Sequence, residues 1–164
     1  MISRLMAVKR GAGGKPPAPF RVWLFVLAVL LCAIPAQAQQ GGARPPSADS
    51  LAGLTILELA GLPDVSPTLR TVVRGRQNAV YRHLHAPGAP TQAANGFAWA
   101  WGCDGGDCAA NGLFIAHEPG GGYLWLVLIQ DGAVVMTVPP RGTRWPPTLV
   151  DAVAAVRPEL RARL

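Results

Sequence analysis

The feature that most constrains the fold is a series of strand-like segments joined by short connections. Residues 96–103 alternate bulky and small side chains, and the segments 112–117, 123–130 and 133–138 are rich in branched and aromatic apolar residues. A parallel crossover needs about a dozen residues or more, and the connections here are shorter. Consecutive strands are therefore expected to pair antiparallel, as a meander.

The segment 96–103 predicts a strand with two unlike faces. Its side chains alternate with period two, and a strand points successive side chains to opposite faces. The bulky face carries Phe97, Trp99, Trp101 and Cys103, and the small face carries Ala98, Ala100 and Gly102. The small face suits the close approach of a helix.

Shorter segments with helix, strand or loop patterns lie on both sides of the strand-rich region. The spacing of apolar residues predicts a helix over 50–60 and another from Thr148 to Pro158, and Ser66-Pro67 opens a short helix over 68–73. The loose alternation over 78–85 predicts a strand, and the Pro/Gly content of 86–94 predicts a loop. The expected fold class is α+β: a single domain with an antiparallel sheet of about five strands flanked by short helices.

The N-terminus has the pattern of a secretory signal peptide. Basic residues up to Arg21 precede an apolar run over 22–34, and Ala36-Gln37-Ala38 follows as a cleavage site. The run is short for a membrane span of roughly 20 residues, so cleavage after Ala38 is favoured over an uncleaved anchor. The predicted organisation is a signal peptide at 1–38, a flexible lead-in at 39–49 and a domain at 50–164. Translation starts at Met1 or Met6.

Charge argues against a nucleic-acid partner. The chain carries +6 overall, but five of the 15 basic residues lie in the leader. The part from residue 39 onward has ten arginines and nine acids, which leaves about +1. Neither nucleic-acid binding nor membrane association after cleavage is expected.

Two cysteines remain after the leader, and they enclose the most distinctive loop. In an exported protein such a pair predicts a disulfide, with two reduced thiols as the alternative. A loop closed in this way keeps one conformation and loses little order on binding a partner. The alternative is a bridge that only closes the hairpin. The expected partner-binding residues are Cys103, Asp104, Gly105, Gly106, Asp107 and Cys108.

The sequence gives weaker support for redox, metal-binding or catalytic functions. Redox dithiols usually have two residues between the cysteines, and the two loop aspartates lack further clustered ligands for calcium. His83 and His85 lack further zinc ligands nearby in sequence, so solvated or edge-strand histidines are the preferred interpretation. The chain has no nucleophile or phosphate-binding motif, so neither an enzyme nor a cofactor or metal site is expected.

With these residues in place, the chain resembles the inhibitor of vertebrate lysozyme (Ivy) family. There a strand leads into a Cys-Lys-Pro-His-Asp-Cys loop and the next strand follows, as residues 96–117 do here. Leu62-Pro63 and the final Trp145 with Leu149-Val150-Asp151-Ala152 are also similar, so the likeness covers roughly residues 50–157. The resemblance implies a five-stranded sheet with helices on both sides, and a periplasmic protein. It also implies a stapled loop whose histidine engages the two catalytic carboxylates of C-type lysozyme.

The loop departs from the family pattern. The two cysteines and Asp107 match, whereas Asp104, Gly105 and Gly106 replace lysine, proline and histidine. The hypothesis is therefore a periplasmic protein that binds a lysozyme-type glycosidase or another peptidoglycan-cleaving enzyme through this loop. The rival hypotheses are a non-inhibitory relative with a structural loop and, more remotely, a redox or sugar-active enzyme. The sequence does not decide between a monomer and a homodimer.

Overall fold

The computed structural model describes residues 46–140 and 142–164. The predicted signal peptide and most of the lead-in lie outside these residues and stay predictions. Among the described helices, none combines the length and the apolar character that a membrane span requires.

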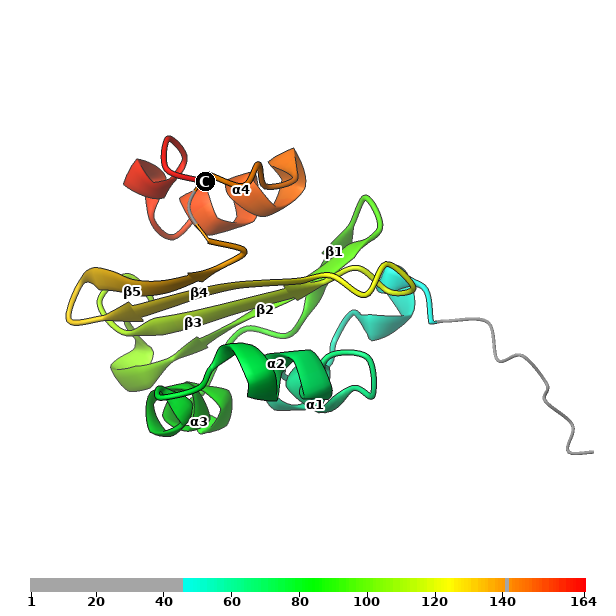
Figure 1. Cartoon of the computed structure of the whole chain (residues 1–164), viewed down its shortest axis with the longest axis horizontal. Helices are drawn as coiled ribbons and strands as arrows, with labels where there is room; N and C mark the ends of the chain where they lie inside the picture. The colour runs from blue at the N-terminus through cyan, green and yellow to red at the C-terminus, as the bar shows by residue number, and fades with distance from the viewer. Residues whose placement is uncertain (1–45, 141) are drawn as a thin grey trace, which may run out of the picture. The chain divides into compact units, whose positions relative to one another are not determined.

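The centre of the fold is a five-stranded antiparallel sheet in the order β1-β2-β3-β4-β5 (Figure 1). Each strand pairs with the next along the chain, as the short connections predicted. The strands are β1 (Gln92–Ala94), β2 (Phe97–Cys103), β3 (Gly112–His117), β4 (Leu124–Gln130) and β5 (Ala133–Val138).

Helices cover both faces of this sheet, and the α+β prediction is confirmed. Figure 1 shows the first three α-helices on one face and the fourth on the other. The α-helices are α1 (Ile56–Gly61), α2 (Ser66–Val72), α3 (Gln77–His85) and α4 (Pro147–Ala154). Short 3-10 helices, η1 (Ala48–Leu51), η2 (Asp104–Gly106) and η3 (Pro158–Leu160), complete the described part.

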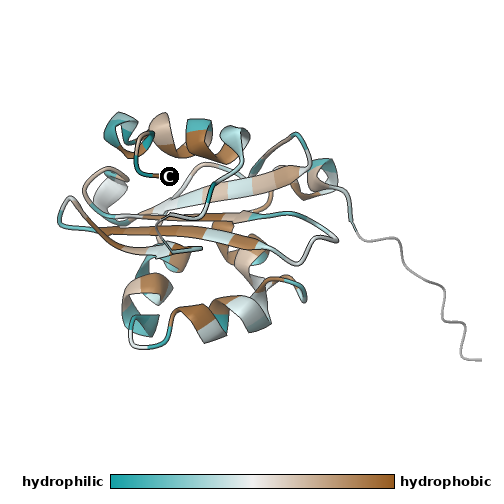
Figure 2. Cartoon of the chain, turned by 45° about the horizontal axis from the view of Figure 1, so that its top comes forward, coloured by the Kyte–Doolittle hydropathy of each residue, from teal (hydrophilic) through white to brown (hydrophobic). Residues whose placement is uncertain are grey.

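Each face of the sheet has its own hydrophobic core, and β2 contributes to both. The small side chains of Ala98 and Ala100 belong to the core under α1–α3, whereas Trp101 belongs to the core under α4 together with Trp145 and Leu149. Hydrophobic residues run along the central strands (Figure 2). Strand β3 is buried along its whole length, as is β4 up to its last residue, because both faces are covered.

The close approach of helix α3 to β2 depends on a glycine. A side chain at Gly102 would collide with the backbone carbonyl of His83 at the end of α3. The glycine therefore lets the end of the helix lie directly against the strand.

The strand predicted over 78–85 is wrong, because these residues form α3. Val80 and His83, three residues apart on one side of the helix, are 3% and 2% exposed. Tyr81 and His85 are exposed, and their rings lie in a tilted contact with centroids 4.2 Å apart. His83 is thus a buried helical residue rather than a solvated or edge-strand histidine, and it does not share a face with the exposed His85.

Two further boundaries differ from the prediction. The helix expected over 50–60 is divided at Gly53, which has φ +89°, and α1 begins after Thr55 in a capping box with Glu58. The loop expected over 86–94 ends in the short strand β1, which pairs with β2 across an Asn95-Gly96 turn.

Substituting Gly102 by alanine tests the contact between α3 and β2. The added Cβ meets backbone, which cannot rotate away, so we expect the free energy of unfolding to fall by about 1–3 kcal/mol. Gly61→Ala is the matched control, since nothing lies within 4 Å of a Cβ there. Urea unfolding of both variants measures the difference, and equal stability of the two would contradict the close approach.

Candidate functional site

The loop between β2 and β3 is closed by a disulfide. Cys103 and Cys108 are bonded, with their Cα atoms 4.5 Å apart. Cys103 is the last residue of β2 and pairs with Gly112 at the start of β3, so one end of the ring is part of the sheet. A Cβ at Gly112 would collide with the carbonyl of Cys108, which shows how tightly the chain turns back.

The tip of this loop is open to solvent. Cys103 is buried, whereas residues 104–107 are exposed. Gly105 and Gly106 have φ of +70° and +80°, which favour glycine, and nothing lies within 4 Å of a Cβ built at either. The tip therefore presents backbone groups and no side chain at these two positions.

The carboxylate of Asp107 holds the turn that follows the tip. Its Oδ1 accepts hydrogen bonds from the backbone N–H groups of Ala109 and Ala110, at 2.9 and 3.1 Å. The Asp107 carbonyl also accepts from the Asn111 N–H at 2.8 Å. This is the usual way in which an aspartate stabilises a turn, and it directs one carboxylate oxygen toward the protein's own backbone.

The base of the loop is bound to the turn between β4 and β5. The Gly132 N–H donates to the Ala110 carbonyl at 2.8 Å, and the Asp131 N–H donates to Asn111 Oδ1 at 3.1 Å. Two neighbouring hairpins thus support each other at this end of the sheet.

Arg157, which follows α4, joins these two hairpins. Its guanidinium group donates to the Ala109 carbonyl and, at 3.1 and 3.2 Å, to the Gly132 carbonyl. The Arg157 side chain is 17% exposed and also pairs with the Glu159 carboxylate. One rigid, forked donor therefore fixes the loop base relative to the C-terminal segment.

Asp104 faces helix α3. Its carboxylate lies 4.0 Å from the Arg82 guanidinium group, and both side chains are at least half exposed. Such a pair contributes little stability, so Asp104 remains available to a partner.

His83, next to Arg82 in helix α3, is buried. Its Nδ1 has no hydrogen-bond partner in the described part of the chain. Burial lowers the pKa of His83, and the Arg82 charge adds to this effect, while the Asp104 charge opposes it.

The structure brings only some of the predicted site residues together. The structure contains the predicted disulfide and an exposed loop tip. Among the described residues no three His, Cys, Asp or Glu side chains gather as metal ligands. His117 is buried, with Nδ1 3.2 Å from the Tyr123 carbonyl oxygen. Sequence reasoning missed Arg157 and Asn111, and no local pattern marks them, because their partners are distant in sequence.

The fold and loop together define a class: small α+β proteins that present a disulfide-closed hairpin tip from an antiparallel sheet. The family model "Inhibitor of vertebrate lysozyme (Ivy)" matches residues 64–159, which is more than half of the chain. The protein therefore belongs to the Ivy family of lysozyme inhibitors, and the predicted resemblance is confirmed. No curated protein and no solved structure is significantly similar to the chain.

Replacing Asp107 by alanine should destabilise the loop base. The two N–H groups that it satisfies lose their acceptor, which costs on the order of 1 kcal/mol. Asp104→Ala is the control, because it removes only a long, exposed ion pair. Amide hydrogen exchange at residues 109–111 should accelerate in the first variant only, and equal exchange in both would contradict the role given to Asp107.

The lowered pKa of His83 predicts a loss of stability on acidification. Below the unfolded-state value of about 6.5, the unfolded chain binds a proton that the native protein binds less readily. The free energy of unfolding should therefore decrease as pH falls from 7 through 6.5 toward the lower native pKa. His83→Leu should flatten this part of the curve. The same pH slope in the variant and the wild type would contradict the burial effect.

Proposed function

We propose that the protein is an exported, periplasmic member of the Ivy family that binds a lysozyme or another peptidoglycan-cleaving enzyme through residues 103–108. The proposal includes cleavage of a signal peptide after Ala38. A disulfide is compatible with an oxidising compartment outside the cytoplasm. Under this proposal the protein is an inhibitor or a binding protein and not an enzyme, in line with the family.

The observation that carries the proposal is the contrast between the loop's tip and its base. The tip is exposed, while the base is held by the disulfide, the Asp107 carboxylate and the Arg157 guanidinium group. A protruding element that is already ordered loses little conformational entropy when it enters a cleft. These features support a role in insertion into a partner's active site.

The tip differs chemically from a loop whose histidine side chain enters the partner's active site. Two carboxylates flank the scissile bond of a retaining glycosidase, and Gly106 has no side chain that reaches them. We propose that the backbone N–H group of Gly105 acts as the donor, since N–H groups bind carboxylates strongly, whereas the Gly106 N–H lies within the 3-10 helix η2. Asp104 repels an ionised carboxylate, which favours an enzyme whose cleft carries basic groups beside its acids.

A second candidate function has its own support. Because one Asp107 oxygen is used internally and Gly106 is bare, the loop also fits a relative in which the bridge is only structural. In that case, changes at the tip leave all partner affinities unchanged.

The decisive experiment compares loop variants of protein purified after expression of the full chain. Turnover of a C-type lysozyme and capture of peptidoglycan-cleaving enzymes are measured with the wild type, Asp104→Ala, Gly106→His and Cys103→Ser/Cys108→Ser. We expect micromolar or tighter binding to one such enzyme. Opening the ring should weaken this binding about tenfold, because the tip must then be ordered on docking. Gly106→His should strengthen inhibition of the C-type enzyme.

Glu118→Gln is the matched control, since Glu118 begins the turn between β3 and β4, at the other end of the sheet. It should bind as the wild type does. Absence of capture and inhibition at micromolar concentrations, with no gain from Gly106→His, would remove the inhibitor proposal and leave the structural loop.

A further inference from the structure

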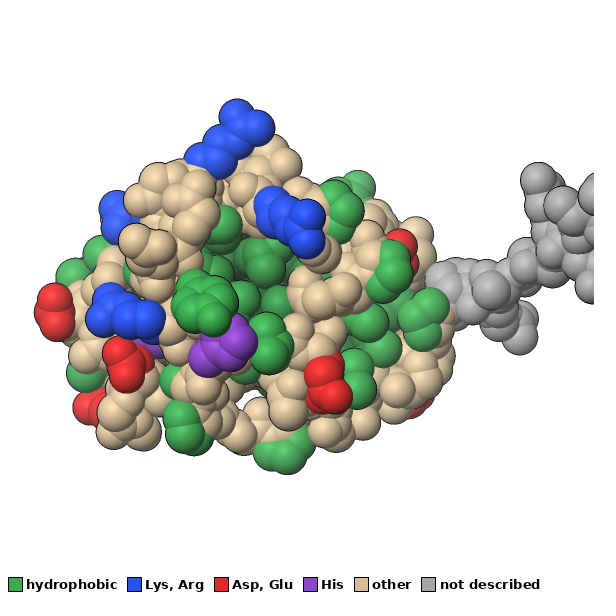
Figure 3. All heavy atoms as spheres, turned by 90° about the horizontal axis from the view of Figure 1, so that it is seen from below, with side chains coloured by type: hydrophobic (Ala, Val, Ile, Leu, Met, Phe, Trp, Pro, Cys, Tyr) green, Lys and Arg blue, Asp and Glu red, His purple; other side chains and the backbone are tan. Residues whose placement is uncertain are grey.

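A groove of about 530 Å³ lies between the three helices that cover one face of the sheet. Figure 3 shows it as an apolar hollow in the helical surface, with basic side chains around it. Its volume is within the roughly 300–1,000 Å³ typical of small-ligand sites. No residue of the loop 103–108 lines it.

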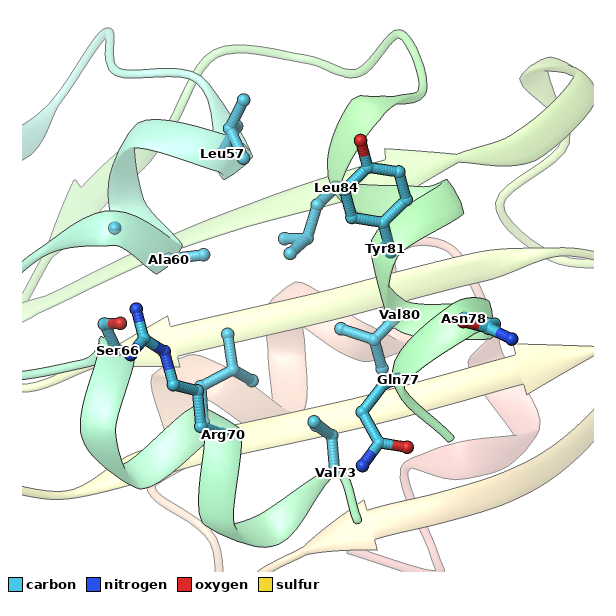
Figure 4. A pocket seen from close by; sticks show the side chains of 12 residues that line it. Leu57, Ala60, Ser66, Arg70, Val73, Gln77, Asn78, Val80, Tyr81 and Leu84 are labelled. Atoms are coloured by element: carbon cyan, nitrogen blue, oxygen red, sulfur yellow. The ribbon is translucent and has the colours of Figure 1, made fainter. Parts of the chain in front are cut away.

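Most of the lining of the groove is apolar. Leu69, Val73 and Val80 form buried parts of its lining. At the rim, Leu57 is 42% exposed and Tyr81 is 63% exposed, and they are two of the three exposed large hydrophobic residues of the described chain. In Figure 4, Leu84 and Val80 of α3 point toward Ala60 of α1 across the hollow. Exposed apolar side chains that gather at a concave site indicate a ligand surface.

Among the residues that the structure describes, Arg70 is the only charged one that lines the groove, and no carboxylate of this part lines it. None of the three ion pairs found among residues 46–140 and 142–164 involves Arg70. Its guanidinium group lies beside Ser66 at one side of the hollow (Figure 4), one helical turn away along α2. The groove thus combines an apolar channel with one cation whose charge is not neutralised by a neighbour.

We propose that this groove binds an anionic amphiphile with a single acyl chain and a carboxylate head, with the chain along the apolar lining and the head on Arg70. Arginine is suited to this role because its planar fork matches a carboxylate with two parallel hydrogen bonds. The uncompensated charge at the edge of an apolar surface is the observation that selects this chemistry.

Charge also decides against two other occupants. The apolar segment 22–34 of this chain follows five basic residues and no acid, so it would bring positive charge toward Arg70. A second copy docked groove to groove would place two Arg70 side chains in one two-fold interface. An anionic ligand brings no positive charge to Arg70 and is therefore not repelled in either way.

The test is a titration of protein purified after expression of the full chain with sodium dodecanoate below its micelle concentration. Calorimetry gives the affinity, and amide chemical shifts give the location. We expect saturable binding, with shifts centred on Leu57, Leu69 and Tyr81. Arg70→Gln should weaken binding at least about tenfold, the loss expected for a hydrogen bond to a charged group.

Arg74→Gln is the matched control. Arg74 is exposed and does not line the groove, and its substitution removes the same charge as Arg70→Gln. Dodecyltrimethylammonium, with the same chain and the opposite charge, should bind weakly. The proposal is overturned by the absence of saturable binding, by equal losses in the two arginine variants, or by equal affinity for the cationic amphiphile. A protein that instead dimerises, and becomes monomeric on Leu57→Ser, would point to a second copy in the groove.

Discussion

The unequal faces of β2 are the constraint on which the rest of the structure depends. Small residues on one face let α1 and α3 approach the sheet, and large aromatic residues on the other fill the space below α4. At Gly102 the approach is so close that the strand and the α3 backbone are in contact. Because β2 ends at Cys103, this packing also fixes where the disulfide loop leaves the sheet. The position of the loop therefore follows from the core.

The loop itself is stabilised by contacts that are local at one end and distant at the other. Asp107 closes its own turn, while Gly132 and Arg157 bring support from segments that follow much later in the chain. Both kinds of contact use backbone groups of residues 109–111. The Asp104 N–H also donates to the Asn111 carbonyl at 3.1 Å, and Gly105 and Gly106 are left exposed at the tip. A rigid base and an exposed tip are thus compatible, and this division of roles suits a binding element better than a uniformly buried hairpin.

The sequence was informative where structure follows from local periodicity. The alternation in β2 and the apolar run of β4 are each specified by neighbouring residues, and both strands were predicted correctly. Helix α3 was missed because it has few apolar residues and part of its buried side is the polar ring of His83. Strand β1 was missed although Asn95-Gly96 is a strong hairpin signal. Arg157 was not predictable, because its partners Ala109 and Gly132 are 48 and 25 residues away.

Gly106 stands where the family pattern has histidine, and in the binding that we propose this changes which groups of a partner the tip can contact. An imidazole can donate and accept and changes charge near neutral pH, whereas a backbone N–H only donates and does not titrate. In the binding that we propose, a tip with a backbone donor in place of an imidazole would take its pH dependence from carboxylates, those of the partner and that of Asp104, rather than from a histidine. It also requires closer contact than a side chain does, since the N–H group cannot reach outward. The disulfide and the Arg157 contact supply the fixed position that such a short-range interaction needs.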